Sequence, residues 1–148
     1  MKLEQLGGLK VRLTGGTDGR GGGDGPVVVL LHGWGAPGDD LVPLGQEIDS
    51  PRGTRYVFPE APLSFQMGFG DPSSTSGPRA ESSGSRGWWM LDLEKRQREI
   101  AAGRARDLSR EIPKGLAEAR AKVIALLDEL ERRLGSKLMV LGGFSQGA

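Results

Sequence analysis

Apolar and polar residues alternate near the start of the chain, and two short, fully apolar runs follow later. Leu9, Val11 and Leu13 alternate with polar residues, which predicts a half-exposed strand in an edge hairpin, ended by the glycine run 15–25. Residues 27–31 (VVVLL) are continuously apolar, which is typical of a strand buried on both faces of a parallel sheet. The run KLMVL, residues 137–141, has the same character. These two runs predict central strands.

Helical spacing appears between the apolar runs. In residues 39–48 apolar positions recur every three or four behind Asp39, a possible N-cap, which predicts a short helix. Residues 56–58 predict a further strand. Residues 113–135 predict the clearest helix, with a proline in its first turn and Gly135 as its C-cap.

The region between residues 64 and 87 is rich in Gly, Ser, Pro and Arg, which predicts a long mobile loop or a lid. Residues 88–112 carry many charges and predict a partly helical surface segment. Strands and helices therefore alternate along the chain, an order that predicts an α/β fold with a mostly parallel sheet flanked by helices. With 148 residues, one domain is expected.

Composition excludes several classes of function. The formal net charge of +1 offers no single-sign field for nucleic acid or an anionic membrane, so neither partner is expected. The absence of cysteine excludes thiolate catalysis and zinc–thiolate sites. The N-terminal residues lack a signal-peptide pattern and no stretch is long and apolar enough to span a membrane, so a cytoplasmic protein is expected.

Two motifs follow the apolar strands. Residues 143–147 (GFSQG) match the G-x-S-x-G nucleophile elbow, in which a serine occupies a strained turn after a strand. The two glycines are needed there because side chains would collide where the chain turns back. Residues 31–35 (LHGWG) end the other strand, and a turn of this kind can present backbone N–H groups to an oxyanion. The alternative interpretations are simple glycine-rich turns after strands.

At these residues the sequence resembles the phospholipase/carboxylesterase family of α/β-hydrolases, which includes acyl-protein thioesterases. The similar blocks are VVLLHGWGAPGDDLVPLG, YVFPEAP, RGWWMLD and LGGFSQGA, in the family's order and across nearly the whole chain. The resemblance implies an α/β-hydrolase fold with Ser145 as nucleophile and the backbone N–H groups of Trp34 and Gln146 as the oxyanion hole. It also places Trp88 and Trp89 near the acyl pocket, although both could instead anchor a loop to the core.

The remaining members of a catalytic triad are not found. His32 is the only histidine, but in α/β-hydrolases the base follows the nucleophile, so His32 is expected to belong to the oxyanion turn. Asp39 and Asp40 are explained as helix-start residues, and Asp92 as a solvated or capping residue. The chain is therefore expected to be an incomplete α/β-hydrolase domain that ends just after the elbow.

The function that follows from the resemblance is hydrolysis of carboxylic ester or thioester bonds through an acyl-serine intermediate. The expected partner is a small-molecule or acyl-ester substrate, and neither a metal nor an organic cofactor is required. Since the acid and base are missing, the 148-residue chain by itself is expected to be inactive. The alternative is a catalytically dead product or a non-enzymatic binding module. A hydrolase-fold acyltransferase or depolymerase would share the same residues.

Overall fold

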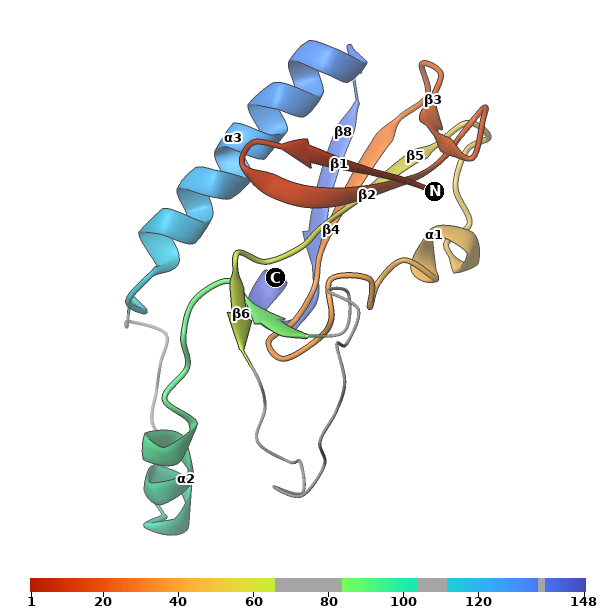
Figure 1. Cartoon of the computed structure of the whole chain (residues 1–148). Coiled ribbons are helices and arrows are strands. Elements are labelled where there is room, and N and C mark those ends of the chain that lie inside the picture. Colours follow the sequence, from red (N-terminus) through yellow and green to blue (C-terminus); the bar gives the residue numbers. More distant parts are fainter. Residues whose placement is uncertain (66–83, 104–111, 136–137) are drawn as a thin grey trace, which may run out of the picture.

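A computed structural model describes residues 1–65, 84–103, 112–135 and 138–148. Its main feature is a six-stranded sheet (Figure 1). Five of the strands follow the order β1-β2-β5-β4-β8, and the sixth, β3, pairs with β2. The strands are β1 (Lys2–Leu6), β2 (Leu9–Gly16), β3 (Arg20–Gly22), β4 (Val27–Leu31), β5 (Arg55–Pro59) and β8 (Met139–Gly143).

The sheet is mixed and mostly antiparallel, so the predicted α/β-hydrolase fold with a mostly parallel sheet is wrong. β1 pairs antiparallel with β2, and β2 pairs antiparallel with β5. Apart from a short β2–β3 contact, parallel pairing is confined to β5, β4 and β8. The alternating pattern of residues 9–13 did indicate a strand, but its hairpin partner is the preceding segment β1. A tight turn between consecutive strands forces antiparallel pairing, and the apolar pattern does not show which strands pair.

The turn of the β1–β2 hairpin requires glycine. Gly7 and Gly8 both have positive φ, 56° and 77°, a region that side chains disfavour. A Cβ added to Gly7 would also collide with the backbone of Leu126, because the turn packs against helix α3 (Leu116–Leu134). The Gly7 N–H donates a hydrogen bond to the Glu129 carboxylate on the same helix. The hairpin is thereby fixed to α3.

The hydrophobic core lies between the sheet and α3. The helix predicted over residues 113–135 is confirmed at its end, Gly135, which adopts the left-handed conformation with φ 55°. Its start is different, because α3 begins at Leu116 behind Gly115 and Pro113 lies before its first turn. Its buried residues Ala119, Leu126 and Leu130 pack with sheet residues in one cluster. The sheet contributes Leu6, Leu9, Val11, Leu13, Val27, Val29, Leu31 and Val57.

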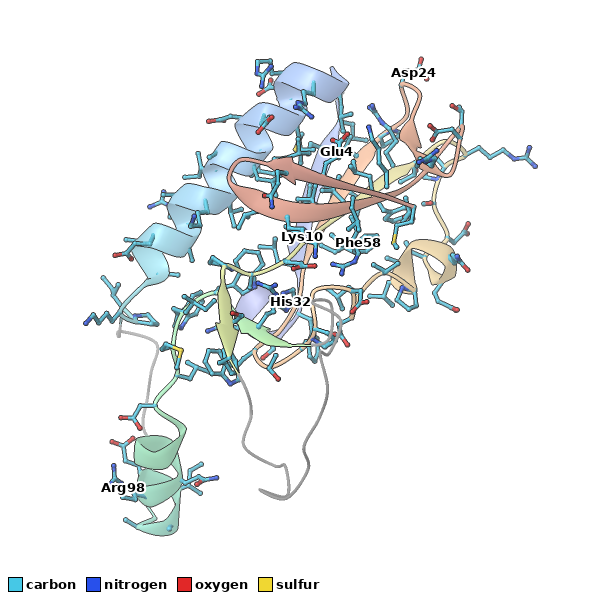
Figure 2. All side chains as sticks on the ribbon, viewed as in Figure 1. Glu4, Lys10, Asp24, His32, Phe58 and Arg98 are labelled. Atoms are coloured by element: carbon cyan, nitrogen blue, oxygen red, sulfur yellow. The ribbon has the colours of Figure 1, made fainter. Side chains whose placement is uncertain are left out.

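The other two α-helices are short. α1 (Leu44–Glu47) is smaller than the predicted helix 39–48, and Pro43 rather than Asp39 occupies its N-cap. α2 (Leu93–Ala101) lies away from the sheet (Figure 1), and Arg98 on it points away from the body of the molecule (Figure 2). Within the described ranges, no helix has the length and apolar character needed to cross a bilayer.

The predicted mobile loop has an ordered base. β6 (Leu63–Phe65) and β7 (Ser85–Gly87) pair antiparallel and bring its two ends together. Residues 66–83, on which the prediction of mobility mostly falls, lie outside the described residues.

β8 forms one edge of the sheet. The strand predicted from KLMVL is confirmed, although β8 begins at Met139 and continues through both glycines. Its predicted burial on both faces is not observed. Among the strands that the structure describes, β8 pairs only with β4, and Val140 and Leu141 are 47% and 48% exposed. These neighbouring residues point to opposite faces of the strand. β8 therefore presents apolar side chains on both of its faces.

Candidate functional site

The two sequence motifs meet at one end of the sheet. β4 and β8 are parallel neighbours with Leu31 opposite Gly143, so their carboxyl ends lie at the same edge. The segments that follow them are in contact: a Cβ added to Gly33 would lie 3.3 Å from the Cβ of Ser145. The structure thus brings the candidate oxyanion turn beside the candidate nucleophile.

Ser145 occupies a strained position. Its φ is 54°, and it is the only non-glycine residue with positive φ among those that the structure describes. This conformation costs an L-amino acid about 1–2 kcal/mol. Ser145 is exposed and begins the short 3₁₀ helix η1 (Ser145–Gly147) directly after β8 and Phe144. A strained serine between a strand and a helical turn is the backbone arrangement of a nucleophile elbow.

Close backbone approach explains both flanking glycines. A Cβ on Gly143 would collide with the carbonyl oxygen of Gly147, and a Cβ on Gly147 would collide with the carbonyl oxygen of Leu31. Neither obstacle is a flexible side chain that could move aside. The glycines at 143 and 147 are therefore required by the path of the backbone around Ser145.

The two candidate oxyanion donors are unpaired among the described residues. The backbone N–H groups of Trp34 and Gln146 donate no hydrogen bond to that part of the chain, whereas the next amide, Gly35 N–H, donates to the Arg86 carbonyl at 2.8 Å. Both unpaired amides come from the segments that meet at Gly33 and Ser145. Two unpaired N–H groups at such a junction suit an oxyanion, and their assignment as oxyanion donors stays a prediction.

His32 is buried and both of its ring nitrogens are occupied. It is 2% exposed, Nδ1 lies 2.8 Å from the Gly33 carbonyl oxygen, and the Ala61 N–H donates to Nε2 at 3.0 Å. Because a carbonyl only accepts and an amide N–H only donates, the ring is neutral with its proton on Nδ1. In this arrangement His32 has no free nitrogen to accept a proton from Ser145.

The bond from His32 to Gly33 also orients the candidate oxyanion turn. The Gly33 carbonyl and the Trp34 N–H belong to one planar peptide unit and point in opposite directions. Holding the carbonyl toward the His32 ring therefore directs the Trp34 N–H away from it. The side chain of His32 thus fixes one peptide of the candidate oxyanion turn, while the oxyanion role of that turn stays a prediction.

The neutral state of His32 predicts a pH-dependent stability. Burial lowers the pKa of His32, outweighing the opposing effect of its bond to Gly33 and of nearby Asp40 and Glu60; Arg86 lowers it further. The unfolded chain, with an ordinary His pKa of about 6.5, then binds a proton first as the pH falls. We expect the free energy of unfolding to fall below about pH 6.5, by at most about 1.4 kcal/mol per pH unit.

Urea denaturation at several pH values between 5 and 7 measures this effect, with the variant His32→Gln as the control. The variant has no titratable group at this position, and it is less stable at pH 7 because it loses the packing of the buried imidazole, whose ring centroid lies 5.7 Å from that of Trp88. The stability difference between the parent and the variant should shrink toward pH 5. A difference that stays constant or grows would show that His32 is not held neutral.

The Gln146 side chain connects the elbow to a distant segment. Its Oε1 accepts from the Trp88 N–H at 2.9 Å, and its Nε2 donates to the Trp89 carbonyl at 2.9 Å. Sequence reasoning assigned Gln146 only a backbone role and missed this contact. No sequence signal reveals it, because the pairing spans 58 residues and uses backbone groups that every residue has.

The two tryptophans predicted near the acyl pocket both lie next to the elbow. Trp88 is buried at 3% exposure in the core cluster, and its indole N–H donates to the His32 carbonyl at 2.9 Å. Trp89 is half-buried against that cluster. The indole nitrogens of Trp34 and Trp89 are buried without a partner in the described residues. The role of Trp88 and Trp89 in substrate binding stays a prediction.

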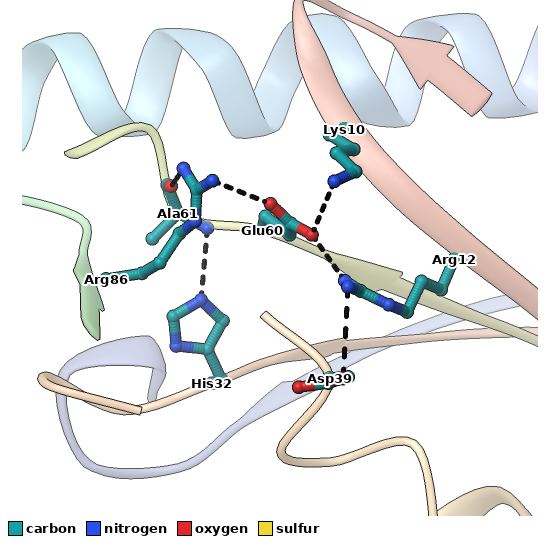
Figure 3. A network of polar contacts seen from close by, with 7 residues as sticks. All are labelled: Lys10, Arg12, His32, Asp39, Glu60, Ala61 and Arg86. Carbon is teal, nitrogen blue, oxygen red and sulfur yellow. Dashed lines mark hydrogen bonds and ion pairs between the residues drawn. The ribbon is translucent and has the colours of Figure 1, made fainter. Parts of the chain in front are cut away.

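A buried ion-pair network supports the segment that carries the tryptophans. The carboxylate of Glu60 contacts Lys10 at 3.5 Å, Arg12 at 2.5 Å and Arg86 at 3.0 Å (Figure 3). Glu60 and Arg12 are each only 3% exposed. Since Arg86 lies in β7 and Glu60 follows β5, this network joins the two strands close to Trp88. Sequence reasoning did not single out any of these four residues.

The acidic residues near the site do not pair with His32. Asp39 lies 4.0 Å from Arg12 (Figure 3), and the Asp40 N–H donates to the Pro37 carbonyl in a turn. Across the described ranges, no group of three or more His, Asp or Glu residues is arranged to hold a metal ion. No protein-family model matches the chain, and no curated protein matches it in sequence.

Proposed function

We propose that the chain carries the nucleophile and the oxyanion donors of a serine-type hydrolase of carboxylic esters or thioesters. The observation that carries the proposal is Ser145 itself, an exposed serine held at φ 54° beside the turn that contains Gly33 and Trp34. Strain of this kind persists only where the surrounding structure enforces it, and it is concentrated at functional sites. The chemistry recurs on unrelated folds, so it does not depend on a parallel sheet.

In the proposed reaction, the Ser145 hydroxyl oxygen attacks the carbonyl carbon of the substrate while a general base accepts its proton. The Trp34 and Gln146 amides stabilise the negative charge that develops on the carbonyl oxygen. The bond to the alcohol or thiol then breaks, and that leaving group receives the proton. Water hydrolyses the acyl-serine and regenerates the hydroxyl. His32 does not serve as the base in this structure, so the base is a different group.

An acyl substrate is supported by the side chains around the serine. Phe144, directly before Ser145, and Met90, directly after Trp89, are exposed apolar residues. Phe144 adjoins Ser145, and Met90 adjoins Trp89, whose carbonyl accepts a hydrogen bond from Gln146 in the elbow. Apolar surface beside a nucleophile suits the hydrocarbon part of an ester or thioester. The resemblance of the four sequence blocks to the phospholipase/carboxylesterase family supports the same substrate class.

The test uses an activated reagent and an external base. The purified chain is treated with a fluorophosphonate in imidazole buffer, and the modified residue is identified by peptide mass spectrometry. The Ser145 oxygen forms a bond to phosphorus, the P–F bond breaks, fluoride leaves and imidazole accepts the proton. We expect Ser145 to react at least about tenfold faster than the other serines, because oxyanion donors stabilise the transition state.

Two controls define the result. Ser145→Ala should lose the selective modification while folding normally, and urea should remove the selectivity of the parent. Modification spread evenly over the serines, or selectivity that persists in urea, would contradict the proposal. That outcome would favour the alternative of a catalytically inactive protein or a binding module.

A further inference from the structure

One buried residue hydrogen-bonds to both halves of the candidate oxyanion hole. The Trp88 backbone N–H donates to Gln146 Oε1 at the elbow, and the Trp88 indole N–H donates to the His32 carbonyl at the oxyanion turn, both at 2.9 Å. The two halves follow different strands, β8 and β4. Trp88 therefore spans the junction on which the relative position of the two donors depends.

The contact with the elbow is made at two points. While Oε1 of Gln146 accepts from Trp88, its Nε2 donates to the Trp89 carbonyl. The planar amide thus binds the backbone of residues 88–89 with both of its polar groups, which fixes its orientation as well as its distance. Since Gln146 directly follows Ser145, this pairing restrains the residue whose backbone N–H is the second oxyanion donor.

The contact with the oxyanion turn lies just before the first donor. The His32 carbonyl that Trp88 binds precedes the Gly33–Trp34 peptide, whose carbonyl the His32 ring holds. Two successive peptide units are therefore fixed, one by the Trp88 indole and one by the His32 ring. The ring of Trp88 also packs near that of His32, with centroids 5.7 Å apart.

The segment that carries Trp88 is itself anchored. Arg86, two residues earlier, forms an ion pair with buried Glu60 at 3.0 Å. The backbone of Arg86 also pairs with the end of the oxyanion turn. The Arg86 carbonyl accepts from the Gly35 N–H, and the Arg86 N–H donates to the Ala36 carbonyl at 3.1 Å. Residues 86–88 are thus held to both sides of the site, and Trp88 has a fixed base from which to position its two partners.

We propose that Trp88 is a positioning residue that sets the distance between the Trp34 and Gln146 amides, an inference that rests on the proposed function. Trp88 acts through these contacts and not by touching substrate, since its side chain is buried in the core. Removing its indole donor frees the His32 carbonyl and loosens the oxyanion turn relative to the elbow. Transition-state stabilisation then decreases, while binding of the reagent is unaffected.

The experiment compares two aromatic variants that each lose one hydrogen bond. Trp88→Phe removes the donor to His32, and Tyr56→Phe removes the bond from the Tyr56 hydroxyl to the Ser50 hydroxyl at 2.8 Å, outside the site. Fluorophosphonate modification of Ser145 in imidazole buffer is measured over a range of reagent concentrations. We expect Trp88→Phe to lower the limiting rate about tenfold with an unchanged half-saturating concentration, because the loss occurs in the transition state.

Tyr56→Phe should also lower the melting temperature but leave the limiting rate unchanged. Gln146→Met removes both side-chain hydrogen bonds between the elbow and residues 88–89, so it should lower the limiting rate as well. Equal limiting rates in Trp88→Phe and Tyr56→Phe, with the parent still selectively modified at Ser145, would overturn the role of Trp88 alone. If the parent shows no selective modification, the proposed function itself fails.

Discussion

Replacing Glu60 with glutamine is expected to destabilise the protein by about 3–5 kcal/mol. The variant keeps the shape of the side chain but removes the one buried carboxylate that faces Lys10, Arg12 and Arg86. Arg12 is as deeply buried as Glu60, and its other acidic neighbour, Asp39, is exposed and 4.0 Å away. A buried guanidinium would then be left without adequate charge compensation. Urea denaturation, followed by far-UV circular dichroism, measures the loss.

Glu4→Gln is the matched control for this prediction. The Glu4 carboxylate also contacts two cationic groups, Lys2 and Arg133, but on the surface of the molecule. Solvent screens such pairs, so its loss should cost less than about 1 kcal/mol. Similar losses in Glu60→Gln and Glu4→Gln would show that the Glu60 network does not stabilise the fold. Because the network holds β7, Glu60→Gln should also slow the modification of Ser145.

Gly147→Ala is expected to eliminate the selective reactivity of Ser145 and to destabilise the fold by about 1–3 kcal/mol. The added Cβ would collide with the Leu31 carbonyl and lie 2.8 Å from the His32 carbonyl oxygen. Both obstacles belong to the backbone at the end of β4, so the elbow has to move away from the oxyanion turn. Fluorophosphonate modification and urea denaturation report the two effects separately.

Gly142→Ala provides the control, because Gly142 lies in β8 only one residue before the motif. A Cβ there meets only the flexible Leu30 side chain, whose Cδ2 lies 3.2 Å away. Alanine should therefore be tolerated, with modification of Ser145 close to that of the parent. If Gly147→Ala reacts like Gly142→Ala, close packing of the elbow against β4 is not required for reactivity.

Local sequence patterns were sufficient for several elements. The apolar run VVVLL forms β4 with the predicted bounds, and the apolar spacing of residues 113–135 forms α3 with Gly135 at its end. The pattern G-x-S-x-G predicted a strained serine after a strand, and Ser145 has that conformation. In each case the determining interactions lie within a few residues of one another, so the sequence alone contains them.

Pairing between strands could not be read in the same way. The alternation in residues 9–13 indicates a strand, but antiparallel pairing of β2 with both β1 and β5 depends on contacts across the fold. The exposure of β8 follows from its position at the edge of the sheet, while its apolar sequence predicted a buried strand. Strand neighbours and sheet edges are settled by the packing of the whole chain, so a correct local pattern led to a wrong fold class.

The sequence by itself determined the identity of the candidate site residues, Ser145 with the Trp34 and Gln146 amides, because short motifs after two strands encode them. Only the tertiary structure decided how these groups are held. It showed His32 as a neutral residue of the candidate oxyanion turn, and the Gln146 side chain hydrogen-bonded to the backbone of residues 88–89. These contacts join backbone carbonyls and amides far apart in the chain. Since every residue carries such groups, no residue type marks their partners, and only the folded arrangement selects them.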